Sequence, residues 1–265
     1  MNAENSPQQA ANTILAIHAH PDDVEILAGG TLAQLSEAGH RVVIVSMTPG
    51  DCGSREHPAE DIAALRRNEA AAAARLIGAL YRCAEFRDLA IFNDDSSRRR
   101  VTEVLRQVRP DVVLTASPVD YMCDHEATSA LVRDACFGAP APNYATRAPS
   151  PAPPLSAIPH LYFMDPIGGV DRDNQPVGAD FYVDIGRTFE TKRAMLAEHA
   201  SQRDWLLQHH GVDDYLLQME RWTRTSGLRA GLELAEGFRR YKGHPYPESP
   251  LLEDLLGGCV VRISS

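Results

Sequence analysis

A dense group of ionisable side chains directly follows the first hydrophobic segment of the sequence. In "AIHAHPDDVE" (16–25), His20, Asp22 and Asp23 come after the apolar run "TILAIHA" (13–19). Imidazole and carboxylate groups are common zinc ligands, and because His20 and Asp23 are three residues apart, one turn of chain can direct both at a single ion. Asp22 lies between them and can approach a water on that ion without being a ligand. The stretch therefore suggests a metal site with an acid beside it.

A catalytic zinc usually has three protein ligands and one open position, so a third ligand must come from elsewhere in the chain. The segment "SPVDYMCDHEAT" (117–128) follows another apolar run, "DVVLTAS" (111–117). Ligands of open α/β sheets bind beyond the carboxyl ends of the strands, where both segments should emerge. His125 is the candidate third ligand, and the neighbouring Asp124 is the candidate carboxylate that orients it.

Apolar runs alternate with helical segments along the chain, which predicts an α/β fold. Strands are expected at 13–19, 41–48, 111–117, 160–165 and 180–185. Strand–helix–strand order predicts parallel pairing with right-handed crossovers, and Gly39 is well placed to follow the end of the first helix. We therefore expect a Rossmann-like, largely parallel sheet flanked by helices. A proline-rich loop at 138–159, C-terminal helices to about residue 238 and an irregular tail should complete the chain.

Bulk properties restrict the class of partner and the organisation of the chain. The 265 residues carry a net charge of −10, which disfavours nucleic acid or an anionic membrane as partner. No segment approaches the roughly 20 apolar residues of a membrane helix. The five cysteines form no C-x-x-C pair, which indicates a reducing, cytoplasmic location. Residues 1–12 read as a flexible polar tail and 13–265 as a single domain.

Other interpretations of "HPDD" remain open at this point. Two adjacent aspartates at a helix start can simply complement the helix dipole. A receiver-type phosphoacceptor domain also has paired acids after its first strand, but it is about half this length. A nucleotide-binding fold is disfavoured because the first turn lacks G-x-G-x-x-G, and Gly29-Gly30 lie within the predicted helix, where they can permit close packing.

The sequence "AHPDDVE", with "DH" after a later strand, resembles the PIG-L (LmbE-like) family of metal-dependent de-N-acetylases. "RRNEAAAAARLIGA", "KRAMLAEHASQ" and "LAEGFR" are similar to further family motifs, so the resemblance spans about residues 13–240. It implies an LmbE-like fold and hydrolysis of an acetyl group from an N-acetylated amino sugar, such as N-acetylglucosamine, or its conjugate. It also implies Zn²⁺, or Fe²⁺ in the same ligands, and self-association as in relatives.

The resemblance also implies roles for individual residues. His20, Asp23 and His125 would be the zinc ligands, Asp22 the general base on a zinc-bound water, and Arg66 a contact to a substrate hydroxyl. The alternative for Arg66 is a purely structural pair with Glu69, because "LRRNEAAAAARL" places Leu65, Glu69, Ala72 and Leu76 on one helix face that we expect to point inward.

The second motif departs from the family pattern. Relatives commonly have D-Y-H-P-D-H, whereas this chain has "DYMCDH", with Met122 and Cys123 in place of His-Pro. That histidine is thought to stabilise the tetrahedral intermediate, and loss of one such donor can cost ~3 kcal/mol. His160 and His244 are the candidates to replace it. Cys123 is a candidate fourth ligand, although packing is the simpler role.

The substrate and the function class keep alternatives open. Tyr121, Asp88, the 138–159 loop and the tail "GHPYPESP" are candidates to line the pocket, and the acidic charge favours a soluble amino-sugar conjugate over a lipid. The alternatives to deacetylation are a metal-dependent amidase with a larger acyl substrate and a non-catalytic metal- or ligand-binding protein, the latter suggested by Met122.

Overall fold

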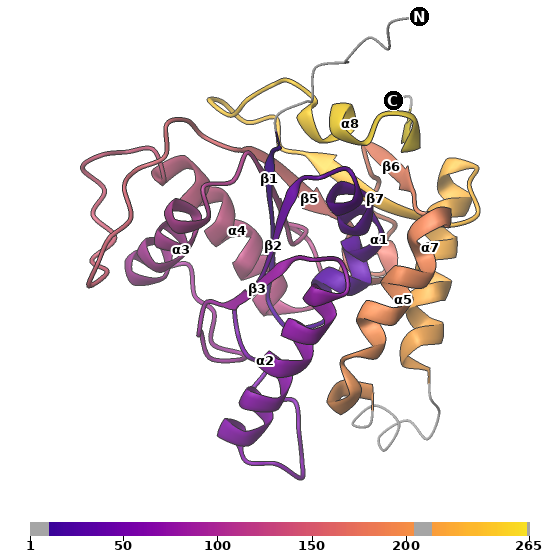
Figure 1. Ribbon diagram of the computed structural model, residues 1–265, viewed down its shortest axis with the longest axis horizontal. Helices are drawn as coiled ribbons and strands as arrows, with labels where there is room; N and C mark the ends of the chain where they lie inside the picture. The colour runs from indigo at the N-terminus through magenta and orange to yellow at the C-terminus, as the bar shows by residue number, and fades with distance from the viewer. Residues whose placement is uncertain (1–10, 204–213, 264–265) are drawn as a thin grey trace, which may run out of the picture.

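One mixed sheet forms the centre of the protein (Figure 1). The structure is a computed structural model that describes residues 11–203 and 214–263. Within these residues eight strands pair in the order β3-β2-β1-β4-β5-β7-β6-β8. They are β1 (Thr13–His18), β2 (Arg41–Ser46), β3 (Leu80–Cys83), β4 (Val112–Thr115), β5 (His160–Met164), β6 (Phe181–Asp184), β7 (Ala235–Arg240) and β8 (Val260–Arg262). The pairs from β3 to β5 are parallel, and the pairs that add β7, β6 and β8 are antiparallel.

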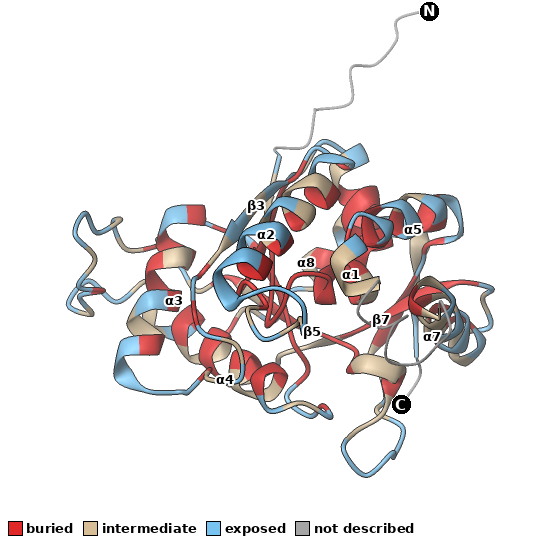
Figure 2. Cartoon of the chain, turned by 90° about the horizontal axis from the view of Figure 1, so that it is seen from below, coloured by how far each residue is buried: buried red, intermediate tan, exposed pale blue. Residues whose placement is uncertain are grey.

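Helices cover both faces of the sheet (Figure 2). They are α1 (Asp23–Glu37), α2 (Ala59–Arg75), α3 (Asp95–Val108), α4 (Cys123–Gly138), α5 (Phe189–Ala197), α7 (Tyr215–Ala230) and α8 (Leu251–Leu256). Alternate residues of β1 enter two separate cores: Ile14 belongs to a core that includes residues of α1, α2, α5, α7 and α8, whereas Leu15 belongs to one that includes residues of α3 and α4. The strand is apolar throughout because both of its faces are buried. Across the described helices, none combines the length and apolarity needed to cross a bilayer.

The five predicted strands are confirmed, each within two residues at either end, as is the left-handed Gly39 after α1 (φ 87°). Residues 139–159 contain no helix or strand, as expected of the proline-rich loop. The predicted N-terminal tail falls almost entirely on residues 1–10, which lie outside the described part of the chain.

Other parts of the prediction are wrong. "LAEGFR" is not helical but contributes β7, because a strand between β5 and β6 gains pairing on both sides even though it has no apolar run. The tail forms α8 and β8 rather than irregular chain, and β3 was missed. The buried face of α2 is also rotated: Leu65 and Leu76 are exposed, whereas Arg66 is buried. An alanine-rich helix has little apolar contrast between its faces, so polar contacts decide which face turns inward.

A buried ion pair joins α1, α5 and β7. Lys192 Nζ donates to Glu236 Oε1 at 2.7 Å, and both side chains are only 1% exposed. The same carboxylate accepts the backbone N–H groups of Gly30 and Thr31 at 2.9 and 2.8 Å. Gly30 permits this close packing, since a Cβ there would lie 2.8 Å from the side chain of Ile185. The motifs around residues 192 and 236 therefore hold α1 in place, and α1 begins in the segment that carries the ionisable cluster.

Breaking this pair should destabilise the fold strongly. Lys192→Met leaves the Glu236 charge buried without its cation, so the free energy of unfolding should fall by about 3–5 kcal/mol in denaturant titrations. The matched control is Lys242→Met, which removes an exposed pair with Asp180 and should cost at most about 1 kcal/mol. Equal effects of the two substitutions would contradict the structural role assigned to Lys192.

Candidate metal centre

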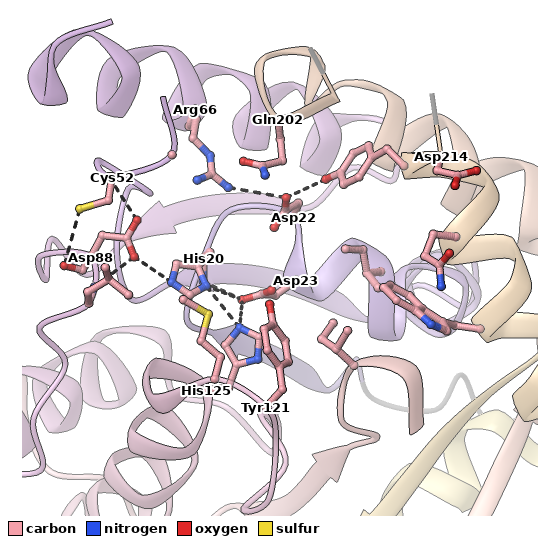
Figure 3. A pocket seen from close by; sticks show the side chains of 18 residues that line it. His20, Asp22, Asp23, Cys52, Arg66, Asp88, Tyr121, His125, Gln202 and Asp214 are labelled. Atoms are coloured by element: carbon pink, nitrogen blue, oxygen red, sulfur yellow. Dashed lines mark hydrogen bonds and ion pairs between the residues drawn. The ribbon is translucent and has the colours of Figure 1, made fainter. Parts of the chain in front are cut away.

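The ionisable cluster lies at the carboxyl ends of two adjacent strands, β1 and β4 (Figure 3). In the sheet, β2 and then β3 follow on one side of β1, and β4 and then β5 follow on the other side. Ligands of open α/β sheets bind at such a point, where two neighbouring loops leave the sheet in opposite directions. The loop after β1 carries His20 and Asp22, and Asp23 opens α1. The loop after β4 carries Asp120, and His125 lies in the first turn of α4.

Three donor atoms meet at nearly equal distances. His20 Nδ1 and Asp23 Oδ2 are 3.2 Å apart, His125 Nε2 and Asp23 Oδ2 are 3.4 Å apart, and the two imidazole nitrogens are 3.3 Å apart. Tetrahedral zinc with bonds of 2.0–2.1 Å separates its ligand atoms by about 3.3–3.4 Å. The structure thus brings the three predicted ligands together with the spacing that a zinc-sized ion needs. We call His20, Asp23 and His125 the ligand trio.

The outer nitrogen of each imidazole has a carboxylate partner. His20 Nε2 donates to Asp88 Oδ1 at 3.0 Å, and His125 Nδ1 donates to Asp120 Oδ1 at 3.0 Å. In the neutral imidazole that carries its proton on this outer nitrogen, the inner nitrogen has a free lone pair, as a metal ligand must have. Asp124, the predicted partner of His125, lies instead 3.5 Å from His20 Nε2. The sequence prediction missed Asp120, whose only signal was its position in the same motif.

His18 is a further residue that the sequence prediction left without a role. Its Nδ1 lies 2.7 Å from Asp23 Oδ2, and its side chain is fully buried. Two ligands of one zinc ion would be farther apart, and His18 is not among the residues that line the adjacent cavity. This spacing is that of a hydrogen bond, which orients the Asp23 carboxylate.

The imidazoles of the trio lie in a negative potential. Burial lowers the pKa of His20, but hydrogen bonds with Asp124, Asp23 and Asp88 outweigh this effect and raise it well above its usual value. The pKa of His125 is also raised, against its burial, by the charges of Asp23 and Asp120 and the hydrogen bond with Asp120. A site that draws protons onto buried imidazoles also favours a divalent cation in their place. The donor set and its charge therefore fit a metal ion.

Asp22 is held apart from the trio by an unusual backbone conformation and two contacts. Its φ of 103° is rare for a residue with a side chain, and such strain tends to occur at functional sites. The Tyr215 hydroxyl donates to Asp22 Oδ2 at 2.7 Å, and Arg66 Nη2 lies 3.6 Å from the same oxygen. Burial raises the pKa of the Asp22 carboxyl, against the opposing effect of Arg66. Tyr215 was not predicted, because it comes from a helix 193 residues farther along the chain.

Arg66 is buried beside Asp22 and does not pair with Glu69. It is 4% exposed, and its guanidinium donates to the backbone oxygens of Pro21 and Gly50 at 2.8 and 3.3 Å. A Cβ at Gly50 would lie 2.0 Å from Arg66 Nη1, so glycine is needed there. Glu69 instead accepts the backbone N–H and the hydroxyl of Ser201. Arg66 therefore belongs to the site rather than to a structural pair within α2.

Met122 and Cys123, which replace the family's His-Pro dipeptide, differ in their surroundings. Met122 lines the cavity, and the neighbouring Tyr121 lies at its mouth, 65% exposed, with its ring edge-on to that of His125. Cys123 is exposed, and its Sγ lies 3.9 Å from Asp124 Oδ1. The donor atoms of the trio are therefore nitrogen and oxygen only, and Cys123 is not one of them.

The two histidines considered as replacements are elsewhere. His160 is the first residue of β5 and pairs with Val112 at the start of β4, so it lies at the opposite edge of the parallel sheet. His244 borders a separate cavity together with Tyr241 and Tyr246. The predicted loop and tail also contribute to that second cavity rather than to the first. His160 lies at the amino end of β5, and His244 follows the end of β7, which is antiparallel to β5, so both lie at the end of the sheet opposite the trio.

A cavity of about 660 Å³ opens directly onto the trio and Asp22. Its described lining is His20, Asp22, Asp23, Ile26, Cys52, Gly53, Arg66, Asp88, Leu89, Tyr121, Met122, His125, Ile167, Gln202, Asp214, Tyr215, Gln218 and Trp222. Among these residues Arg66 is the single arginine or lysine, and four are aspartates. The cavity thus combines a negatively charged floor with apolar and amide-bearing walls.

Comparisons with known proteins agree with this geometry. Residues 15–136 match the family model described as PIG-L: GlcNAc-PI de-N-acetylase. The diacetylchitobiose deacetylase of Thermococcus kodakarensis is 27% identical over 256 residues, which cover 90% of this chain and 86% of that protein. The structure of N,N'-diacetylchitobiose deacetylase from Pyrococcus horikoshii superposes with a TM-score of 0.73 at 26% identity, covering 92% of this chain and 90% of that one.

One relative is named for a different reaction. The 4-oxalmesaconate hydratase of Pseudomonas putida is 28% identical over 206 residues, which cover 75% of this chain and 76% of that protein. Sequence similarity at this level therefore extends to more than one kind of chemistry. The site itself must decide between them.

Removing a trio histidine should remove the metal. His20→Ala and His125→Ala should each lose nearly all zinc after dialysis, whereas His18→Ala should bind with affinity reduced about 10–100-fold, because it only orients Asp23. Zinc per chain, measured by elemental analysis, gives the result, and His244→Ala is the matched control with full zinc content. If His18→Ala lost as much zinc as His20→Ala, His18 would have to be counted among the ligands.

Proposed function

We propose that this chain, which matches the PIG-L family model over residues 15–136, is a member of the PIG-L (LmbE-like) family of de-N-acetylases and hydrolyses the acetamide of an N-acetylated amino sugar or its conjugate. The proposal rests on one observation at the carboxyl ends of β1 and β4: the side chains placed to bind a metal are distinct from the side chain placed to act as a base. Three donor atoms have the spacing of metal ligands, and Asp22 lies beside them with its carboxylate held outside the set. The cytoplasmic location and the self-association expected from the sequence stay predictions.

The trio would hold the metal, either Zn²⁺ or Fe²⁺. When bound there, the ion would supply a Lewis acid that acidifies water and stabilises negative charge on the acetamide oxygen. Asp88 and Asp120 would keep the two imidazoles in the orientation and tautomer that ligation requires, and His18 would do the same for Asp23. The remaining chemistry belongs to the side chains of this chain.

Asp22 is the proposed general base. In the described part of the chain both of its side-chain contacts, with Tyr215 and Arg66, fall on Oδ2, so Oδ1 is left to accept a proton from the attacking water. The water oxygen forms a bond to the acetamide carbon, and the C–N bond then breaks. Asp22 returns the proton to the departing nitrogen, so acetate and a free amine are the products. Arg66 holds the carboxylate in place and is the proposed contact to a sugar hydroxyl.

Hydration of a carbon–carbon double bond is the second candidate, because one relative is a hydratase and the same base could activate water for that reaction. The charge of the cavity weighs against it. A related solved structure is named 4-carboxy-2-hydroxymuconate hydratase, so that substrate carries carboxylate groups. Here the charge of Arg66, the single arginine or lysine of the described lining, is offset by Asp22, and four aspartates line the cavity. A neutral sugar suits this lining better than a polyanion.

An acetate-release screen tests the proposal directly. The zinc-loaded protein should release acetate and a primary amine from acetamido sugars and their glycosides, and it should not hydrate 4-carboxy-2-hydroxymuconate. Turnover of amides with larger acyl groups but not of acetamides would instead identify an amidase of different specificity. Bound zinc without hydrolysis of any amide would leave a binding protein.

Replacing the proposed base should separate metal binding from turnover. Asp22→Asn should keep full zinc content, because Asp22 is not in the trio, while kcat falls by about 10²–10⁴-fold through loss of proton transfer. Steady-state acetate release together with elemental analysis of the same sample gives both results. Retention of wild-type kcat by this variant would remove Asp22 from the mechanism.

Tyr215 should matter through its hydroxyl. Tyr215→Phe removes one hydrogen bond to a charged carboxylate, which is worth about 1.5–3 kcal/mol, so kcat should fall by roughly 10- to 100-fold with zinc content unchanged. Tyr144→Phe, which changes a tyrosine at the second cavity, is the matched control. A Tyr215→Phe enzyme as fast as this control would show that the Asp22 carboxylate needs no support from α7.

A further inference from the structure

A second cavity, of about 470 Å³, is separate from the cavity at the ligand trio, and the two described linings share no residue. Its walls come from α3, α4, the 139–159 loop and the chain after β7, so it lies on the side of the sheet that α3 and α4 cover (Figure 2). His125 lies in the first turn of α4, whereas Arg133 and Phe137 lie near the end of that helix. The volume is within the range of about 300–1,000 Å³ that is typical of small-molecule sites.

The charge of this lining contrasts with that of the whole chain. The described lining contains two arginines, Arg98 and Arg133, and one acidic residue, Asp134. The chain as a whole has a net charge of −10, and the first cavity has one arginine and four aspartates. A local excess of positive charge on an acidic protein attracts anions. The second cavity is therefore suited to a negatively charged ligand.

One hydrogen-bonded chain of side chains holds both guanidinium groups in place. Arg98 Nη1 donates to the backbone oxygen and to Oδ1 of Asn93 at 3.2 and 2.8 Å. Asn93 Nδ2 donates to Asp134 Oδ2 at 3.1 Å, and Arg133 Nε and Nη2 donate to Asp134 Oδ1 at 3.1 and 2.9 Å. In the described part of the chain, Nε and Nη2 of Arg98 and Nη1 of Arg133 have no hydrogen-bond acceptor, so the two fixed cations keep donors for the oxygen atoms of a ligand.

The rest of the lining is rich in aromatic rings. Four of its ten described residues are phenylalanine or tyrosine, whereas aromatic residues make up 6% of the chain. Phe137 is 58% exposed, so its ring is accessible to a ligand. The ring of Tyr241 lies edge-on to that of Tyr246 with centroids 4.7 Å apart, and the Tyr246 hydroxyl donates to the backbone oxygen of Arg133. These contacts fix the chain after β7 against α4, and the fixed rings favour a ligand that is itself an aromatic ring.

We propose that the second cavity is a binding site for a planar aromatic carboxylate. The ring of the ligand packs against Phe137 and Tyr241, and its carboxylate accepts hydrogen bonds from the free N–H groups of Arg98 and Arg133. Asp134 offsets one of the two guanidinium charges, so a ligand with a single negative charge suits the site better than a polyanion. This binding is additional to the proposed hydrolysis at the trio and does not depend on it.

Calorimetric titration of the zinc-loaded protein with 2-naphthoate tests both requirements of the site. 2-Naphthoate should bind about tenfold more tightly than naphthalene-2-carboxamide, which lacks the charge, and than cyclohexanecarboxylate, which lacks the aromatic ring. The affinity should be the same after zinc has been removed, because the second cavity shares no lining residue with the trio. Equal affinity for the carboxylate and the carboxamide, or loss of 2-naphthoate binding together with zinc, would overturn the proposal.

Substitutions in the lining locate the bound ligand. Arg98→Gln and Arg133→Gln should each weaken 2-naphthoate binding about tenfold, because each removes a cationic donor, and Arg82→Gln, at an exposed arginine of β3, is the matched control. Phe137→Ala should weaken binding by a similar factor and leaves the core intact, whereas Phe92→Ala, at a phenylalanine that is 64% exposed and outside the described lining, should have no effect. If the cavity variants bound 2-naphthoate as tightly as their controls, the second cavity would not be the site.

Discussion

The site depends on one geometric constraint: three donor atoms from two strand ends must share a common distance of about 3.3 Å. Atoms of this kind, an anion beside two imidazoles, need a positive charge among them when they are buried, which either protons on the imidazoles or a metal ion can supply. The surrounding contacts hold the three donor atoms at this spacing. Asp88 and Asp120 fix the two rings, His18 fixes the carboxylate, and the buried pair of Lys192 and Glu236 fixes α1, whose first residue is Asp23.

A second constraint keeps the proposed base out of the ligand set although it is adjacent to it in sequence. The strained backbone at Asp22 turns its carboxylate away from Asp23, towards Tyr215 and Arg66. Two neighbouring aspartates thereby acquire different roles from different environments. A side chain at Gly50 would meet the guanidinium of Arg66 in its present position, so the loop after β2 participates in the site without contributing a side chain of its own to the reaction.

Sequence reasoning was successful where the information is local or follows from sheet topology. His20 and Asp23 lie on one turn, and His125 joins them because parallel strands end at one edge. Tyr215 could not be foreseen, since its approach depends on how α7 packs far along the chain. His160 failed as a candidate for a topological reason, as it opens a strand rather than ending one. The strand β7 was missed because its residues are stabilised in an extended conformation by the neighbouring strands on both sides rather than by an apolar sequence pattern.

The central claim is that one metal ion is bound by the trio. Anomalous diffraction at the zinc edge from crystals of the zinc-loaded protein tests this claim most directly. We predict a single peak about 2.0–2.2 Å from His20 Nδ1, Asp23 Oδ2 and His125 Nε2, with Asp22 outside bonding distance. A peak between His20 Nε2, Asp88 and Asp124, where the donor atoms also lie within 4.8 Å of one another, would contradict the account.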